Sequence, residues 1–170
     1  MGSGGVPRLS FVERLASTRA GAWYFINVTA KIDPWLLKRT GGRVSSIVGQ
    51  PVLLLQHTGA RSGAARETPL VYATDGDDIV LIASNGGSVR HPAWYHNLVA
   101  KPECGVIAAG RSGPYVATEV DGDERSRLWS RALAVYGGYA VYQQRTGGRR
   151  IPLLRLTRRT QIDETPKGTT

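Results

Sequence analysis

The sequence predicts an α+β fold, in which a small, mostly antiparallel β-barrel carries a helical arm at its N-terminus. Short apolar runs of strand length recur from residue 51 onward and are separated by turns rich in glycine and aspartate. Helical patterns lie between some of these runs, but the chain lacks the strand–G-x-G-x-x-G–helix unit of a dinucleotide-binding Rossmann domain. Five or six short strands joined by hairpins favour a closed or half-closed barrel.

Composition indicates one domain of 170 residues with an ordinary hydrophobic core. Hydrophobic residues make up 41% of the chain, which excludes wholesale disorder, and no apolar run approaches the roughly 20 residues of a membrane span. The first twenty residues include Glu13, Arg14 and Arg19, so we expect no secretory signal. The single cysteine, Cys104, cannot form an internal disulfide, and we expect a cytoplasmic protein.

The charge balance points to an anionic partner. Lys and Arg number 22 against 13 Asp and Glu, a net charge of +9, and most of the excess is arginine. Arginine favours bidentate recognition of phosphate or carboxylate, although the same excess is compatible with side chains that are simply solvated. No helix-turn-helix, ribonucleoprotein or zinc-finger motif accompanies the charge, so we expect no nucleic-acid partner.

Residues 1–40 form the predicted helical arm. Ser10 and Glu13 have the spacing of a capping box, and Asp33 followed by Pro34 predicts the start of a second short helix that ends at the glycines 41–42. The arm mixes aromatic and basic residues. It is therefore expected to pack over the core or a partner subunit, or to make peripheral contact with a membrane surface.

Residues 41–160 supply the predicted barrel, and residues 161–170 a polar tail. Hairpin turns are predicted at residues 75–78 and 110–113, a short helix at 92–100, and a helix capped by Asp121 and Glu124. The predicted strands share short apolar or β-branched runs and cover residues 52–55, 68–74, 79–83, 106–109, 115–120 and 151–156.

Two loops could bind a ligand. Residues 58–63 (TGARSG) combine two glycines with Arg61 and Ser62, and Arg66 follows, so the loop has the composition of an anion cradle as well as that of an ordinary hairpin loop. Residues 83–87 (ASNGG) end an apolar strand with two glycines, which allow a flat ligand to approach the backbone, or form a plain turn.

Two aromatic segments complete the candidate site. In the predicted helix 92–100, Trp94, Asn97 and Leu98 share a face that could wall an aromatic ligand. The tyrosines at 136, 139 and 142 surround a Gly-Gly pair and are interpreted as a mobile substrate wall or as core packing. The histidines lack the spacing of a zinc helix or a hydrolytic triad, so we expect no metal.

These segments, in this order, resemble the deazaflavin-dependent nitroreductase family of F420-dependent oxidoreductases, in its flavin/deazaflavin oxidoreductase A branch. The resemblance runs from about residue 38 to residue 152, and its most specific parts are PVLLL at 51–55, TGARSG at 58–63, TPL at 68–70, ASNGG at 83–87 and PAWYHNL at 92–98. It implies a split β-barrel of the flavin-reductase or pyridoxamine-phosphate-oxidase type. It also implies hydride transfer from reduced coenzyme F420 to an electron-poor acceptor such as a quinone, an enone or a nitroarene.

The resemblance also implies roles for individual residues. The coenzyme carries a phosphate and a polyglutamate tail, which the arginines would hold. Tyr139 and Ser84 are the implied catalytic residues, and Tyr136, Tyr142 and Val71 would shape the substrate pocket. The implied coenzyme-binding residues are Ala60, Arg61, Ser62, Arg66, Ile82, Ala83, Ser84, Asn85, Ala93, Trp94, Tyr95, His96, Asn97 and Tyr139.

The chain departs from the family pattern at three of these positions. Ala60 stands where a basic residue is common, Asn85 where lysine is common, and Val71 where the nitroimidazole-reducing enzyme has tyrosine. Tail and ring contacts are therefore expected to be weaker here, and nitroimidazole reduction does not follow from the resemblance. The alternatives are an FMN oxidoreductase on the same barrel, a carrier of a flavin or haem-like ligand, and a basic membrane-surface protein.

Overall fold

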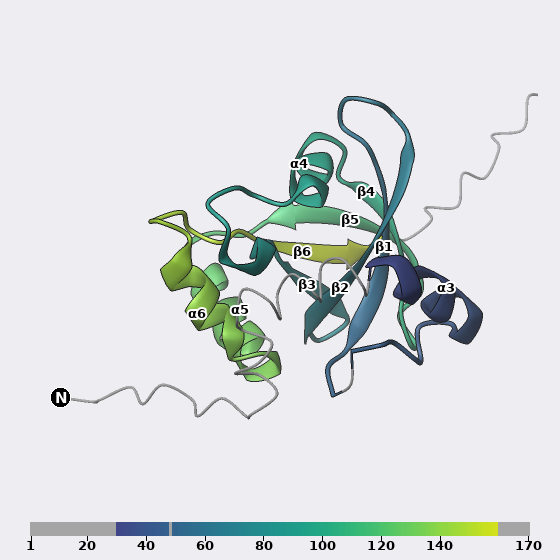
Figure 1. Ribbon diagram of the computed structural model, residues 1–170, viewed down its shortest axis with the longest axis horizontal. Helices are drawn as coiled ribbons and strands as arrows, with labels where there is room; N and C mark the ends of the chain where they lie inside the picture. Colours follow the sequence, from purple (N-terminus) through teal and green to yellow (C-terminus); the bar gives the residue numbers. More distant parts are fainter. Residues whose placement is uncertain (1–29, 48, 160–170) are drawn as a thin grey trace, which may run out of the picture.

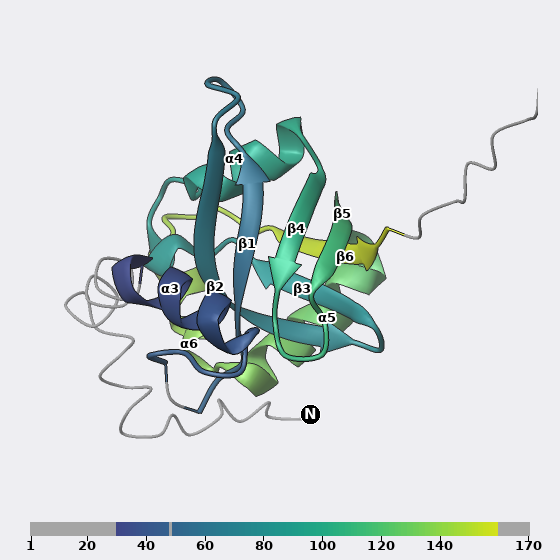
Figure 2. The same ribbon diagram turned by 90° about the vertical axis from the view of Figure 1, so that its right-hand side faces the viewer.

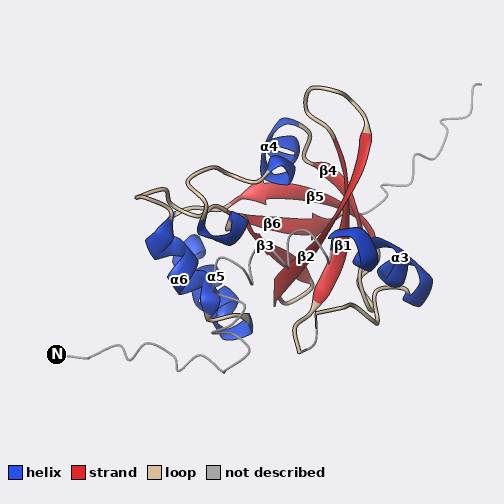
Figure 3. Cartoon of the chain, viewed as in Figure 1, coloured by secondary structure: helices blue, strands red, loops and turns tan. Residues whose placement is uncertain are grey.

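The described part of the chain is a closed antiparallel barrel of six strands (Figures 1 and 3). The computed structural model describes residues 30–47 and 49–159. Around the barrel the strands follow the order β1-β2-β3-β6-β5-β4, and β1 pairs with both β2 and β4. The strands are β1 (Val52–Thr58), β2 (Ala65–Asp75), β3 (Asp78–Ile82), β4 (Glu103–Ile107), β5 (Gly113–Glu119) and β6 (Leu153–Arg158). The predicted barrel is confirmed.

Helices cover the barrel outside and at one end. Helix α3 (Ala30–Thr40) lies across the lower ends of β1 and β2 in Figure 2. Helices α5 (Gly122–Val135) and α6 (Gly138–Arg145) lie together against the strands on another side (Figure 1). A 3₁₀ turn, η2 (Asn85–Gly87), follows β3 and precedes α4 (Ala93–Ala100).

This arrangement explains why residues 52–55 form an unbroken apolar run. Leu53 and Leu55 point into the barrel core, whereas Val52 and Leu54 pack with Leu37 of α3 on the outer face. β3 is buried on both faces for the same reason, because α5 covers its outer side. A strand covered on both faces needs apolar residues at every position.

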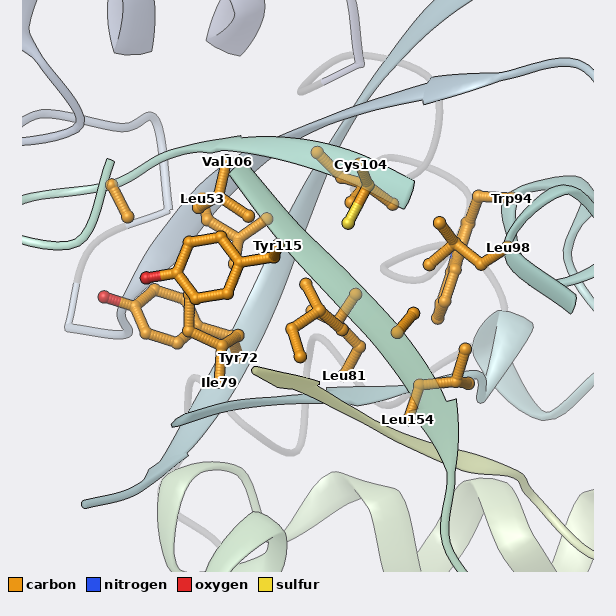
Figure 4. Close-up of a cluster of buried hydrophobic side chains, with 14 of the residues drawn as sticks. Leu53, Tyr72, Ile79, Leu81, Trp94, Leu98, Cys104, Val106, Tyr115 and Leu154 are labelled. Atoms are coloured by element: carbon orange, nitrogen blue, oxygen red, sulfur yellow. The ribbon is translucent and has the colours of Figure 1, made fainter. Parts of the chain in front are cut away.

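Large side chains fill the barrel from end to end (Figure 4). Trp94 and Leu98 enter from α4, so this helix closes one end of the core. Tyr72 and Tyr115 lie toward the other end, where the Tyr115 hydroxyl donates to the carbonyl of Arg111 at 2.9 Å. The α4 position is therefore fixed by core packing, and this helix also borders the candidate site.

Most predicted elements are present, with shifted boundaries. The hairpin turns at 75–78 and 110–113, the helix near 92–100 and the Asp121 N-cap are confirmed. The strand from Ala65 begins three residues earlier than predicted, because cross-strand pairing extends as far as Thr58 and Ala65. The predicted helix at Ser10 lies outside the described residues.

The predicted cap at Asp33 is wrong. Helix α3 already includes Ala30, which places Asp33 in its first turn and Pro34 inside the helix. The Asp33 carboxylate is fully buried and accepts a hydrogen bond from the Ser46 N–H at 2.7 Å. The side chain therefore ties a loop to the helix instead of capping it.

Within residues 30–47 and 49–159, no helix has the length and apolar character that crossing a membrane requires.

Candidate functional site

A cleft of about 880 Å³ lies between the β1–β2 turn and α4. The turn stands beside α4 at the top of the barrel in both ribbon views (Figures 1 and 2). Eight predicted coenzyme-binding residues line this cleft: Ala60, Arg61, Ser62, Arg66, Ala93, Trp94, His96 and Asn97. Its remaining lining residues are His57, Gly59, Ala65, Glu67 and Thr68.

A buried hydrogen-bond chain joins the two walls of the cleft. The Ala60 N–H donates to Asn97 Oδ1 at 2.9 Å, which fixes the orientation of the Asn97 amide. Asn97 Nδ2 therefore faces His57 Nδ1, at 3.1 Å, as a donor. Because Nδ1 must accept, the neutral His57 ring carries its proton on Nε2 and donates it to Thr68 Oγ1 at 3.1 Å.

A neutral His57 ring is consistent with this series of hydrogen bonds. Burial of the ring, with a smaller contribution from the nearby Arg66 guanidinium, lowers the pKa of His57 below its usual value. A neutral ring at physiological pH is the form that the Asn97 amide requires. The sequence offered no sign of this pairing, since the two residues are 40 positions apart.

The anion cradle differs from the one predicted for the loop at 58–63. Of the six backbone N–H groups in residues 59–64, those of Gly59, Ala60, Gly63 and Ala64 are used within the protein. Ser62 Oγ also accepts one of them, from Ala64 at 3.3 Å. The cationic donors of the cleft are therefore the exposed guanidinium groups of Arg61 and Arg66, and the backbone contributes less than predicted.

The one carboxylate in the lining is neutralised from outside the cleft. Glu67 Oε2 pairs with Lys38 Nζ of α3 at 2.7 Å, and Glu67 Oε1 accepts a hydrogen bond from Gln56 Nε2 at 3.1 Å. The hydrogen bond from Lys38 lowers the pKa of Glu67. The cleft consequently keeps a positive character that suits a phosphate or carboxylate.

A second group of predicted residues gathers at the end of β3, outside the lining of the cleft. Ile82 packs in a cluster with the three tyrosines, whose ring centroids are 5.1, 5.9 and 6.3 Å apart. Ala83, Ser84 and Asn85 continue from Ile82 into η2, which packs against α6. The structure thus brings the β3 end and the tyrosines together.

The tyrosines form a compact, buried triangle. The spacing of three between these tyrosines would place them along one side of a single helix. Helix α6 begins at Gly138, however, so Tyr136 lies outside it and this row is not formed. Tyr136 Oη and Tyr142 Oη are 3.2 Å apart. Burial raises the pKa of Tyr139 far above its usual value, so this phenol stays protonated at neutral pH.

Two predicted residues lie elsewhere. Val71 of β2 packs with Leu37, Val52 and Leu54 beneath α3, apart from both groups. Tyr95 turns toward β5, where its hydroxyl donates to Glu119 Oε2 at 2.8 Å and burial raises its pKa to about 12. Within the described ranges, no cluster of three or more His, Cys, Asp or Glu residues could hold a metal ion.

Arg149 is a residue that the sequence did not single out. It comes from the turn after α6 and donates hydrogen bonds to the carbonyls of Ala83, Ser84 and Ser88. Nothing in the local pattern distinguishes it from Arg150, whose side chain is exposed and pairs with Asp121. Only the folded chain shows that one of these adjacent arginines reaches the candidate site.

Comparison with known proteins identifies the family. The family model described as F420H(2)-dependent quinone reductase matches residues 29–158. An F420H(2)-dependent quinone reductase of Mycobacterium tuberculosis is 37% identical over 129 residues, covering 73% of this chain and 86% of the relative.

Two solved structures share the fold. An F420-H2 dependent reductase, FDR-A, has a TM-score of 0.59 and 34% identity, over 67% of this chain and 100% of that one. A chain described as a domain-swapped dimer has a TM-score of 0.60 and 32% identity, over 73% of this chain and 98% of that one. The barrel, the order of its motifs and these relatives agree: the chain belongs to the F420H(2)-dependent quinone reductase family.

Proposed function

We propose that this protein is an oxidoreductase that transfers a hydride from reduced coenzyme F420 to a quinone. The observation that carries it is the positively charged cleft between the β1–β2 turn and α4, in a chain of this family. Its volume, about 880 Å³, lies within the range of roughly 300–1,000 Å³ that is typical of sites for small molecules and cofactors.

The residues of the cleft fit this coenzyme. Arg61 and Arg66 offer bidentate donors for its phosphate and its acidic tail. The small side chains of Ala60, Ala65 and Ala93 line the cleft and leave room in it for the coenzyme. When bound, the reduced deazaflavin supplies a hydride, because carbon stands where a flavin has its reactive nitrogen.

The protein's own part is to orient the acceptor and to handle a proton. A quinone that accepts a hydride gains negative charge on an oxygen and becomes a hydroquinone once a proton follows. We assign the orientation of that oxygen to Ser84 and Tyr139, with Tyr136 and Tyr142 shaping the surroundings. Its raised pKa keeps the Tyr139 phenol protonated, so it can donate a hydrogen bond to that oxygen but is a weak acid and cannot serve as a base at neutral pH.

A turnover assay under anaerobic conditions tests the proposal. Menadione reduction is followed with F420H2 or with reduced FMN as the donor, and F420 binding is measured by fluorescence. We expect turnover with F420H2 and little with FMN. The reverse preference would make the protein an FMN oxidoreductase, and F420 binding without turnover would make it a carrier.

Helix α3, the described end of the arm, supports a second part of the proposal: the protein would be cytoplasmic and would contact a membrane surface, where quinones dissolve. On α3, Ile32 and Trp35 are 50% and 68% exposed, and Arg39 follows on the same side of the helix. Co-sedimentation with anionic liposomes should fall for Trp35→Ser and remain unchanged for the control Val99→Ser on α4. Equal binding by wild type and Trp35→Ser would contradict this part alone.

A further inference from the structure

One guanidinium group, that of Arg149, binds both ends of the segment that joins β3 to α4. At the start of this segment, Nη1 donates to the Ala83 carbonyl at 3.3 Å and Nη2 to the Ser84 carbonyl at 2.9 Å. Toward its end, Nε and Nη2 donate to the Ser88 carbonyl at 3.1 and 2.8 Å. Nη1 also lies 3.1 Å from His91 Nδ1. Arg149 therefore clamps residues 83–91.

All of these acceptors are neutral. Since a guanidinium has donors only, His91 Nδ1 must accept, and the His91 ring carries its proton on Nε2. Within the described ranges Arg149 forms no ion pair, although it is half-buried. Its charge is instead compensated by carbonyl dipoles that converge from the two ends of this one segment. An arginine placed in this way depends on the fork geometry of its donors.

The clamped segment contains a tight left-handed turn, in which Asn85 is the residue other than glycine. Asn85, Gly86 and Gly87 have φ values of 50°, 61° and 81°, three successive residues in the left-handed region. Besides Arg149, local hydrogen bonds support this turn: the Gly87 N–H donates to Ser84 O at 3.1 Å and the Ser88 N–H to Asn85 O at 3.0 Å. Asn85 Nδ2 also donates to the Arg90 carbonyl at 3.0 Å. A turn of this kind persists when its surroundings hold it in place.

Arg149 is itself held firmly. The Gln143 side chain of α6 donates from Nε2 to the Arg149 carbonyl at 2.7 Å and accepts from the Ile151 N–H at Oε1, at 2.9 Å. The clamp thus connects the side of the barrel that carries the tyrosines to the start of α4, and this helix lines the cleft from its first residue, Ala93.

We infer that Arg149 is a positioning residue, which fixes the end of β3 and the start of α4 in the mutual placement that the coenzyme site needs. This inference rests on the proposed function, since Ala83 and Ser84 are the residues expected beside the deazaflavin ring. Arg149 acts through their carbonyls and not by touching the coenzyme.

Amide hydrogen exchange on the coenzyme-free protein provides the first test, and F420 affinity the second. In Arg149→Ala the amides of Gly87 and Ser88 should exchange about tenfold faster while those of β3 stay protected. The Kd for F420 should rise about tenfold, which corresponds to about 1.4 kcal/mol. Arg149→Lys should behave like Arg149→Ala, because an ammonium cannot reproduce the fork.

The matched control is Arg150→Ala, the adjacent arginine on the surface. Arg150→Ala should change neither the amide exchange rates of Gly87 and Ser88 nor the Kd for F420. Millimolar guanidinium chloride, compared with equal sodium chloride, should restore F420 affinity in Arg149→Ala but change nothing in Arg150→Ala.

The inference would be overturned if the amides of Gly87 and Ser88 exchanged in Arg149→Ala at the same rate as in wild type. It would also be overturned if exchange rates rose uniformly over the whole barrel. If wild-type protein binds no F420 while the local increase in exchange is seen, the proposed function fails and the clamp loses its link to the coenzyme. The two failures are therefore distinguishable.

Discussion

Asn97 should make a large contribution to the free energy of unfolding, because its amide provides the hydrogen-bond partners of groups on both walls of the cleft. Asn97→Leu keeps the side-chain volume but leaves the Ala60 N–H and His57 Nδ1 without their partners. Each buried unsatisfied group costs about 1–3 kcal/mol, so two of them cost about 2–6 kcal/mol. We expect a value near 3 kcal/mol, because Ala60 lies in a half-exposed turn that water can reach.

Denaturant and thermal unfolding measure this cost. For a chain of this length a loss of 3 kcal/mol lowers Tm by about 6–12 °C. His96→Leu, on the same helix but with an exposed side chain, should change stability by no more than about 0.5 kcal/mol. A Tm for Asn97→Leu equal to that of His96→Leu would refute the reasoning.

A double-mutant cycle with His57→Leu isolates the shared hydrogen bond. Because each single variant already breaks the contact between the two side chains, the double variant should cost about 1–2 kcal/mol less than the sum. Additive costs would show that the two residues act independently and that the hydrogen-bond chain does not couple the walls.

Three further outcomes are expected. Because the pKa of His57 is lowered, the folded state binds fewer protons than the unfolded state below pH 6.5. The contribution of His57 to the free energy of unfolding is therefore complete above pH 6.5 and is lost as pH falls below it, by at most about 1.4 kcal/mol per pH unit. In His57→Gln the free energy of unfolding should fall less steeply with decreasing pH, and the same pH dependence as in wild type would contradict the assignment. Gly42→Ala places a Cβ against the Ala108 backbone at a φ of +82° and should cost about 3 kcal/mol, whereas Gly41→Ala, with φ +62° and open space around it, should cost about 1 kcal/mol. Equal Tm values for the two variants would show that the predicted clash is absent. Tyr139→Phe should lower kcat for menadione by a larger factor than it weakens F420 binding, and an unaltered kcat removes Tyr139 from the mechanism.

Local sequence signals predicted the fold because each element satisfies its own pattern. The run at residues 52–55 reads as a buried strand because both faces of β1 are covered, and the turns at 75–78 and 110–113 carry residues that only turns prefer. The predicted helix start at Asp33 was wrong, because an aspartate followed by proline is also compatible with a position inside the first turns of a helix. In the fold, the Asp33 carboxylate accepts from the Ser46 N–H, a partner that the local pattern does not reveal.

The candidate site could be predicted only in its parts. The sequence predicts both the loop at 58–63 and a helix at 92–100, but their connection through Asn97 and His57 depends on barrel closure. Arg149 illustrates the same point, since its acceptors lie more than 55 residues away in the chain. A single sequence cannot show which of two adjacent arginines turns inward.

Mapping the F420 footprint on the protein tests the central claim most directly. Amide hydrogen exchange is compared with and without saturating F420 for wild type, for Arg61→Ala combined with Arg66→Ala, and for Arg43→Ala, an exposed arginine outside the cleft. We predict protection at residues 59–68 and 93–97 in wild type and Arg43→Ala, and its loss in the combined variant. Protection confined to the face beneath α3, or none at saturation, would contradict the assignment of this cleft to the coenzyme.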